Sequence, residues 1–283
     1  MVLLDRYLDK VENLPPAPTV AVQLLDLFSN PDRDIDRIVN LISHDPSLTA
    51  ETLQRCNRGC LTGAEPPEDM FEAVSRLGLY EIYSIVLGLM ASRTMKQVRA
   101  KYSWDANRLW QHTVVTAVIS SALAKRVQVA EATAFTAGLL HDIGKLVLVS
   151  MEGVVYADLV RTAGFFGPSL AAAETSCLGF THAALGARLL ARWGLPDGLR
   201  LAVELHHQSP ATASNHIRLA AVVNFANSLA HQMADGPTGA PAAAEASPEA
   251  MELVQLTAKD IPALVQRINL DLRQIQGLLH MHA

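Results

Sequence analysis

Apolar residues recur at helical spacing along almost the whole chain, and this pattern limits the possible folds more than any other feature. Val20, Leu24 and Phe28 share one such stripe, and the spacing resumes after the break at Asp45-Pro46. Alternation of apolar and polar residues between Asn-Gly or Asp-Gly turns, which would indicate strands, is absent from the sequence. The sequence therefore predicts an all-α fold.

Composition limits the class of protein and its partners. Of the 283 residues, 50% are hydrophobic and 18% are charged, which predicts a globular chain large enough for two subdomains. The formal net charge of −5 and the lack of a Lys/Arg cluster argue against a nucleic-acid polymer as partner. No apolar run is long enough to span a membrane, and the three cysteines have no framework spacing, so we expect a cytoplasmic protein with reduced thiols and no membrane partner.

The distribution of histidines predicts how the chain is divided. Residues 1–103 are expected to form a small bundle of short helices without a cluster of catalytic residue types. Residues 104–283 carry histidines inside their apolar stripes and are expected to form the larger helical domain that holds the functional site. The stretch at about 235–248 is rich in Pro, Gly, Ala and Ser and predicts a flexible segment, followed by C-terminal helices.

The pair His141-Asp142 ends an apolar helical run and is followed by Gly144 and Lys145. On a continuous helix, Gly138, His141 and Lys145 would share one face, and the small residue would let a neighbouring helix approach closely. An imidazole beside a carboxylate in an apolar setting suits a divalent metal. For this pair alone, the alternative is a buried histidine hydrogen-bonded to its neighbour.

Further histidines occupy helical positions at which a core residue would be apolar. His112, for example, lies in line with Thr116 and Ile119. Such polar groups are costly to bury without a shared partner, and one metal ion, or two bridged by Asp142, would satisfy them together. We therefore predict a site for a divalent metal (Fe, Mn, Zn, Mg or Ni) formed by six residues: His112, His141, Asp142, His182, His206 and His207.

The order of these residues resembles the ligand series of the HD metal-dependent phosphohydrolase superfamily. Three segments in the first half of the chain resemble the HDOD family, the HD-related output domains of bacterial signalling proteins: Leu14-Pro15-Pro16-Ala17-Pro18, Asp45-Pro46-Ser47-Leu48 leading to Asn57, and Ala73-Val74-Ser75-Arg76-Leu77-Gly78. The resemblance covers the chain from about Leu14 to Ala230. It implies a small N-terminal helical subdomain packed on an HD-type multi-helix bundle that carries the metal site.

One departure from the family pattern concerns the end of the ligand series. HD enzymes end it with an aspartate, and the matching residue here is Asn227, whose amide offers only a neutral oxygen. In the family's two-metal arrangement this residue serves the same metal as His112, His141 and Asp142. We therefore expect one firmly bound metal rather than two. The resemblance implies that it would take Asp142 together with a trio of histidines: His182, His206 and His207.

The resemblance implies two functions of different classes. The first is a signal-transduction or regulatory module, weakly or not catalytic, that transmits a state to a protein partner. The second is a metal-dependent phosphohydrolase or phosphodiesterase acting on a phosphorylated small molecule or nucleotide. In the second, Asp142 would ligate and orient, and Lys145 would bind the phosphoryl oxygens. A di-iron oxygenase is a variant of the second function that needs both metals.

Two features of the sequence bear on this choice. The segment after His207 reads Gln208-Ser209-Pro210 and lacks the Gly-Tyr-Pro motif of the cyclic-di-GMP phosphodiesterases, so that activity is not expected. For Lys145, the alternative to a catalytic role is a helix-end lysine that faces solvent and is favoured by the helix dipole. The missing carboxylate at Asn227 should harm chemistry more than folding, which favours the regulatory module.

Overall fold

The computed structural model describes residues 35–43, 69–78, 106–166, 169–208, 215–235 and 248–274, with single positions 4, 5, 7, 8, 49, 52, 53, 56, 67, 82 and 85. All regular elements in this part of the chain are helices, so the predicted all-α class is confirmed. None of these helices has the length and apolar character needed to cross a membrane. The proline-rich segment at 14–18, the motif at 45–48 and residues 236–247 of the expected flexible segment lie outside the described residues.

The chain divides into two compact units. The smaller unit comprises Pro15–Thr94, and the larger comprises Met1–Leu14 together with Met95–Ala283. The sequence predicts a division at residue 103 and assigns the first residues to the N-terminal subdomain, whereas their contacts place them in the larger unit. The functional division at residue 103 stays a prediction.

In the smaller unit, the described helical residues bury their apolar faces. Helix α3 (Ile35–Ser43) is one of these elements, and residues 70–78 form part of another. The second helix starts at Asp69, whose Oδ1 accepts a hydrogen bond from the Glu72 backbone N–H at 2.7 Å. Six almost fully buried residues belong to the core of this unit: Ile38, Ile42, Ala73, Val74, Ile82 and Ile85.

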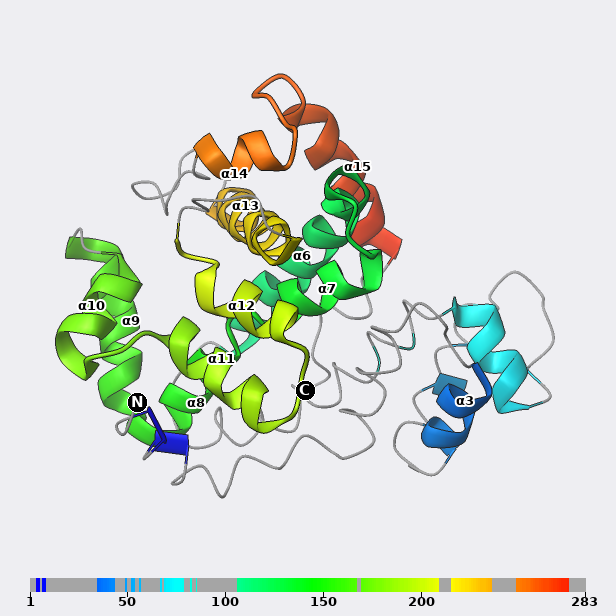
Figure 1. Ribbon diagram of the computed structural model, residues 1–283, viewed down its shortest axis with the longest axis horizontal. Coiled ribbons are helices and arrows are strands. Elements are labelled where there is room, and N and C mark those ends of the chain that lie inside the picture. The colour runs from blue at the N-terminus through cyan, green and yellow to red at the C-terminus, as the bar shows by residue number, and fades with distance from the viewer. Residues whose placement is uncertain are drawn as a thin grey trace. The chain divides into compact units, whose positions relative to one another are not determined.

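The larger unit is a bundle of helices that surrounds the predicted site (Figure 1). The helices that carry site residues, or lie next to those residues in the chain, are α6 (Ala106–Ala124), α7 (Glu131–Leu140), α8 (Ile143–Glu152), α11 (His182–Arg192), α12 (Asp197–Leu205) and α13 (Asn215–Asp235). The remaining elements are the 3-10 turn η1 (Lys125–Val127), α9 (Val154–Phe166), α10 (Leu170–Leu178), α14 (Pro248–Leu253) and α15 (Ile261–Gln274).

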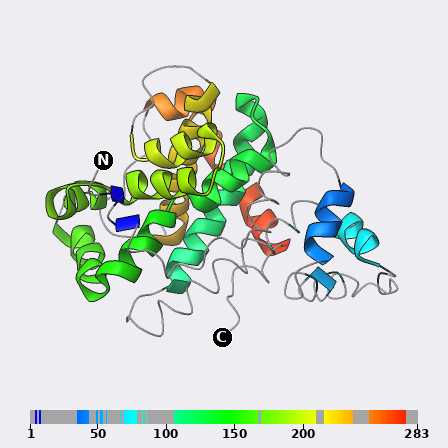
Figure 2. The same ribbon diagram turned by 60° about the horizontal axis from the view of Figure 1, so that its bottom comes forward.

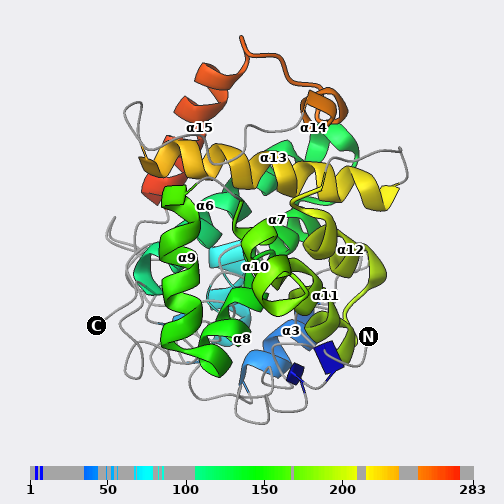
Figure 3. The same ribbon diagram turned by 90° about the vertical axis from the view of Figure 1, so that its left-hand side faces the viewer.

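Helix α13 is the element that joins most of this bundle. It packs against α6, α7 and α12 on one side, and α14 lies against it on the other (Figure 3). Helix α11 packs against both α8 and α12, while α9 and α10 lie side by side at one end of the unit (Figure 1 and Figure 2). The packing therefore brings α6, α8, α11, α12 and α13 around one volume.

The first residues of the chain are held on α8 and α11 by three kinds of contact. Leu8 is buried in a cluster with Val147 of α8 and Leu185 of α11. Tyr7 donates a hydrogen bond from its hydroxyl to Glu152 Oε1 at 2.6 Å. Asp5 and Arg188 form an ion pair, with 2.9 Å between Oδ1 and Nε. These contacts explain why residues 1–14 belong to the larger unit.

Two glycines allow the helices at the site to approach each other closely. A Cβ atom at Gly138 of α7 would lie 2.7–2.9 Å from atoms of α6, including Ala117 Cα and Thr116 O. A Cβ at Gly144 of α8 would lie 1.9 Å from the carbonyl oxygen of His182, at the start of α11. Any side chain at Gly144 must therefore push α8 and α11 apart.

Replacing Gly144 by alanine tests how tightly these helices are packed. Helix propensity alone favours alanine over glycine. We nevertheless expect Gly144→Ala to lower the free energy of unfolding by about 1–3 kcal/mol, because overpacking forces the backbone to move. Urea unfolding of the purified protein measures the change.

Gly186→Ala is the matched control, because Gly186 faces Gly144 across the same pair of helices. Its added Cβ would meet Ile143 Cγ2 at 3.1 Å and the backbone N of Gly144 at 3.2 Å. These contacts need a shift of only a few tenths of an ångström, so the loss should be smaller. Equal losses for the two variants would show that the contact at Gly144 has no special role.

Candidate metal centre

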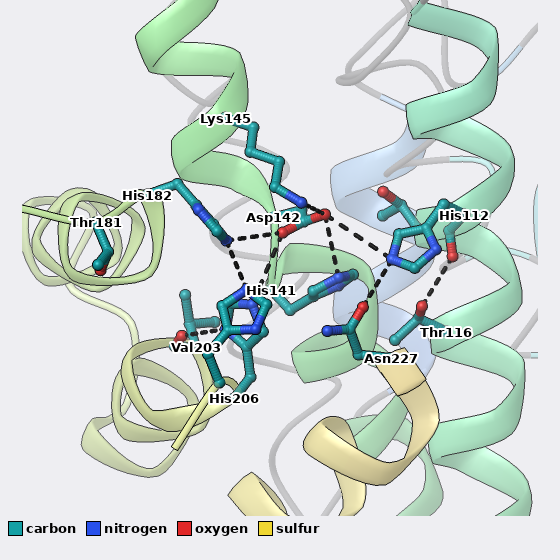
Figure 4. A network of polar contacts seen from close by, with 12 residues as sticks. His112, Thr116, His141, Asp142, Lys145, Thr181, His182, Val203, His206 and Asn227 are labelled. Carbon is teal, nitrogen blue, oxygen red and sulfur yellow. Dashed lines mark hydrogen bonds and ion pairs between the residues drawn. The ribbon is translucent and has the colours of Figure 1, made fainter. Parts of the chain in front are cut away.

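The structure brings the predicted site residues of the larger unit to one place (Figure 4). His112 lies on α6, His182 is the first residue of α11, and His206 ends α12. Among the described residues, two groups of potential ligands lie close enough to hold a metal ion, and they share one carboxylate. These groups are Asp142 with His182, His206 and His207, and Asp142 with His112 and His141.

The backbone at His141-Asp142 differs from the continuous helix that the sequence suggests. Helix α7 ends at Leu140 and α8 begins at Ile143, so the pair forms the turn between them. The prediction that Gly138, His141 and Lys145 share one face of one helix is therefore wrong. Because the chain turns here, Asp142 becomes the residue that precedes α8 and points its carboxylate into the centre of the histidines.

The two oxygens of Asp142 face different groups of histidines. Oδ1 lies 3.2 Å from His182 Nε2 and 3.7 Å from His206 Nε2. Oδ2 lies 3.3 Å from His141 Nε2 and 3.9 Å from His112 Nε2. A carboxylate with its oxygens directed to two separate ligand groups can serve either group or bridge both.

Hydrogen bonds orient three of the imidazoles so that Nε2 faces inward. His141 Nδ1 donates to the Gly138 carbonyl oxygen at 2.6 Å, and His206 Nδ1 donates to the Val203 carbonyl oxygen at 2.6 Å. His182 Nδ1 donates to the carboxylate of Glu174, with 2.7 Å to Oε2. Because these oxygens only accept, each Nδ1 carries the proton, which leaves Nε2 available as a ligand.

Several of the inward-facing polar atoms have no hydrogen bond. His141 Nε2, His206 Nε2 and Asp142 Oδ1 are buried and have no hydrogen-bond partner. Buried polar atoms are normally paired, so an unpaired group of this kind indicates a missing partner. Imidazole nitrogens around a carboxylate are ligands that divalent transition metals accept, and the residues present therefore fit such an ion.

The charges of the site also suit a cation. Burial, and then the neighbouring histidines, hold the pKa of His206 well below its ordinary value, so its imidazole is neutral. Burial alone would raise the pKa of Asp142, but His141 and Lys145 lower it well below its ordinary value, so the group is a carboxylate. Neutral imidazoles and an ionised carboxylate are the forms in which these groups bind metals.

His182 differs from His206 in its electrostatics. Burial and Lys145 would lower the pKa of His182, but hydrogen bonds to the carboxylates of Asp142 and Glu174 raise it above its ordinary value. His207 is the exposed member of the group and places Nε2 3.0 Å from His182 Nε2. The trio side therefore contains the carboxylates of Asp142 and Glu174, and it reaches solvent at His207.

Lys145 lies inside the site rather than on the surface. Its side chain is buried, and Nζ donates to Asp142 Oδ2 at 2.6 Å. The alternative of a solvent-facing helix-end lysine is therefore wrong. The ammonium group neutralises the oxygen of Asp142 that faces His112 and His141.

Asn227 lies where the family pattern requires an aspartate. Its side chain is buried, and Oδ1 lies 2.8 Å from His112 Nε2. His231 stacks on the ring of His112, with 4.1 Å between the ring centroids. Burial, and then His231 and His141, lower the pKa of His112 well below its ordinary value.

The sequence pattern does not single out two of the residues around the ligands, Glu174 and Tyr156. Glu174 and Tyr156 are buried behind His182, and Asn224 Nδ2 donates to the His206 carbonyl oxygen at 2.8 Å. Glu174 lies in the alanine-rich helix α10, where a charged residue ordinarily marks the exposed face. Its single signal in the sequence is its position eight residues before His182.

The buried pair of Asp142 and Lys145 gives a prediction about stability without metal. Asp142→Ala leaves the Lys145 ammonium buried without its partner, and we expect the free energy of unfolding to fall by about 3–5 kcal/mol. Adding Lys145→Met should recover most of that loss, because the unpaired charge is removed together with its partner. Chemical denaturation in the presence of a chelator measures both variants. A double variant no more stable than Asp142→Ala would contradict the pairing.

This chain is similar to a known family and to a curated protein of a bacterium. The model of the HDOD domain family matches residues 14–209. A protein of Treponema pallidum that is itself uncharacterised is 27% identical over 234 residues, which are 81% of this chain and 44% of that protein. The chain thus spans less than half the length of this relative.

Two solved structures share the fold. An HDOD domain protein of unknown function from Geobacter sulfurreducens has a TM-score of 0.78 at 21% identity. The match covers 98% of this chain and 96% of that protein. A candidate phosphohydrolase from Shewanella amazonensis has a TM-score of 0.68 at 26% identity, with 96% of each chain covered. The first likeness concerns the fold alone, because the sequence identity is low.

Proposed function

The chain belongs to the HDOD domain family, and on that premise we propose that it is a regulatory module built around one divalent-metal site. In this proposal, Asp142 binds the metal with the trio His182, His206 and His207. The half of the site around His112, His141 and Asn227 stays without a metal. The module passes a state to a protein partner in a signalling pathway.

The hydrogen bond between His112 and Asn227 carries this proposal. A neutral imidazole has one nitrogen that donates and one that accepts. Because the Asn227 amide oxygen faces His112 Nε2 at 2.8 Å, Nε2 is the donor in this orientation of the amide, and its lone pair is then not available to a metal. An aspartate at residue 227 would supply the charge that an amide lacks.

Lys145 supports the same asymmetry. Its ammonium lies 2.6 Å from Asp142 Oδ2, the oxygen that faces His112 and His141. A metal held by His112 and His141 would have to compete with the Lys145 ammonium for this oxygen. Oδ1 faces the trio and lies 3.2 Å from His182 Nε2 and 3.7 Å from His206 Nε2.

A second candidate function is metal-dependent hydrolysis, for which the chain has suitable residues. A bound divalent metal would act as a Lewis acid and lower the pKa of a coordinated water. Asp142 would ligate and orient, and Lys145 would neutralise phosphoryl oxygens of a phosphorylated small molecule or nucleotide. The likeness to the candidate phosphohydrolase from Shewanella amazonensis favours this alternative.

Metal stoichiometry tests the proposed asymmetry. Elemental analysis after incubation with Mn²⁺, Fe²⁺ or Zn²⁺ and removal of free ions should give about one metal per chain, because the trio and Asp142 form the larger of the two ligand groups. His206→Ala should lose this metal. His112→Ala should keep it, as the matched control from the other half. Wild-type protein that takes up no metal and melts at the same temperature with each ion would refute the metal site.

Restoring the carboxylate at residue 227 tests the cause of the asymmetry. Asn227→Asp should raise uptake toward two metals per chain. The aspartate would supply the charged oxygen ligand that the amide of Asn227 lacks. The same elemental analysis measures the effect. Gln232→Glu, an exposed position on the same helix, serves as the control and should leave uptake unchanged. Unchanged uptake in Asn227→Asp would show that Asn227 does not decide the number of metals.

Turnover separates the module from the enzyme. The regulatory module predicts no metal-dependent hydrolysis of phosphomonoesters, phosphodiesters or nucleotides by the loaded wild-type protein. The phosphohydrolase predicts turnover with added metal that disappears in Asp142→Ala. Hydrolysis that depends on metal and is absent from Asp142→Ala would therefore replace the first function by the second.

A further inference from the structure

A fully buried carboxylate lies behind the trio, outside the predicted ligand set. Glu174 of α10 and Tyr156 of α9 have exposed fractions of 0% and 1%, and both lie against the start of α11. A charge buried this deeply is costly unless hydrogen bonds replace its water shell. The identity of its partners therefore indicates what the carboxylate does.

Glu174 directs both of its oxygens to His182. Oε2 accepts the backbone N–H of His182 at 2.8 Å and the ring Nδ1–H at 2.7 Å, and Oε1 lies 2.9 Å from the same Nδ1. Tyr156 donates its hydroxyl to Oε1 at 2.5 Å. The Glu174 carboxylate thus accepts a hydrogen bond from Tyr156 on one side and from the His182 imidazole on the other.

Capping of α11 does not account for this arrangement. Thr181 already caps the helix, because its Oγ1 accepts the backbone N–H of Ala184 at 3.1 Å. A cap by Glu174 would need one oxygen on the His182 backbone N–H and no contact with the ring. The contact with Nδ1 instead fixes the tautomer and the rotation of the imidazole.

His182 differs from the other oriented histidines of the site in the acceptor that its Nδ1 contacts. His141 and His206 donate from Nδ1 to backbone carbonyl oxygens, of Gly138 and Val203. Within the described residues, His182 is the site histidine whose Nδ1 donates to a carboxylate. A charged acceptor makes the opposite nitrogen a stronger electron donor than a neutral carbonyl does.

We propose that Glu174 and Tyr156 are positioning residues that hold His182 with Nδ1 as donor and present its Nε2 to a divalent metal on the trio side. This inference rests on the proposed metal site and deepens it. Tyr156 keeps Glu174 from rotating, Glu174 orients and polarises His182, and His182 faces Asp142 Oδ1. Neither Glu174 nor Tyr156 contacts the metal.

The same unit contains a matched control. Tyr7 donates to Glu152 Oε1 at 2.6 Å, which is the same type of contact as that between Tyr156 and Glu174. Neither Tyr7 nor Glu152 has a contact with a site histidine among the hydrogen bonds described. Tyr7→Phe and Glu152→Gln therefore report the general effect of removing such a pair.

The first measurement is metal affinity, by competition of Zn²⁺ or Co²⁺ with a chromophoric chelator. Glu174→Gln should weaken binding by about 10- to 100-fold, the usual range for loss of an outer-shell partner, and should shift the visible spectrum of the Co²⁺ protein. Tyr156→Phe should change both in the same direction by a smaller factor. Tyr7→Phe and Glu152→Gln should change neither.

The second measurement is made on metal-free protein and does not depend on metal binding. The Nδ1–H of His182, bonded to a buried carboxylate, should give a slowly exchanging, far-downfield proton signal that couples to ¹⁵N-labelled histidine. Glu174→Gln should shift this signal upfield, and Glu152→Gln should leave it in place. The signal is assigned by its loss in His182→Ala.

The outcomes separate this inference from the proposed function. If Glu174→Gln lowers thermal stability but leaves affinity and the Co²⁺ spectrum unchanged, Glu174 is a structural cap and the positioning role is overturned. If the wild-type protein binds no metal, the proposed function fails, while the downfield signal still decides whether Glu174 holds His182. A signal that keeps its chemical shift in Glu174→Gln overturns the positioning role in either case.

Discussion

The burial of one carboxylate, Asp142, is the constraint on which the larger unit depends. A carboxylate surrounded by apolar helices is stable only if positive or donating groups are brought to it. Lys145 supplies the charge at 2.6 Å, and inward-facing imidazoles from α6, α11 and α12 complete its surroundings. The helices must approach closely to deliver these groups, which is why glycine stands at residues 138 and 144.

The surroundings of Asp142 are unequal on its two sides, and this inequality is the basis of the functional argument. The side of Oδ1 offers oriented imidazoles and a second carboxylate behind them. The side of Oδ2 is occupied by the ammonium of Lys145 and by a histidine bonded to Asn227. An HD-type site altered in this way is better suited to hold one metal than to run two-metal chemistry.

The residues that the sequence identifies best are those whose type conflicts with their position. Histidines in apolar stripes are visible because helical periodicity assigns them to the core, and the structure buries four of them around Asp142: His112, His141, His182 and His206. The interrupted helix at His141-Asp142 was not visible, because both residues are compatible with a helix and no proline marks the turn. Glu174 was not visible either, because a glutamate among alanines has the pattern of an exposed helix face.

The difference between the predicted division and the compact units has a similar origin. Tyr7 and Leu8 contact helices far away in the sequence, and their partners, such as Glu152 and Leu185, carry no local sign of the contact. Boundaries drawn from composition follow the order of the chain. Compact units follow contacts, so they can join segments that flank an intervening unit.

Local sequence determined the helical class, the helix starts at Ser169 and Thr181, and the residue types of the site, because periodicity and capping act within a few residues. The tertiary structure alone decided that Lys145 is buried, that Asn227 bonds to His112, and that Glu174 stands behind His182. These relations depend on the crossing of helices separated by up to 115 positions in the chain. Hydrogen bonds and burial at such crossings are set by packing geometry, which no local pattern records.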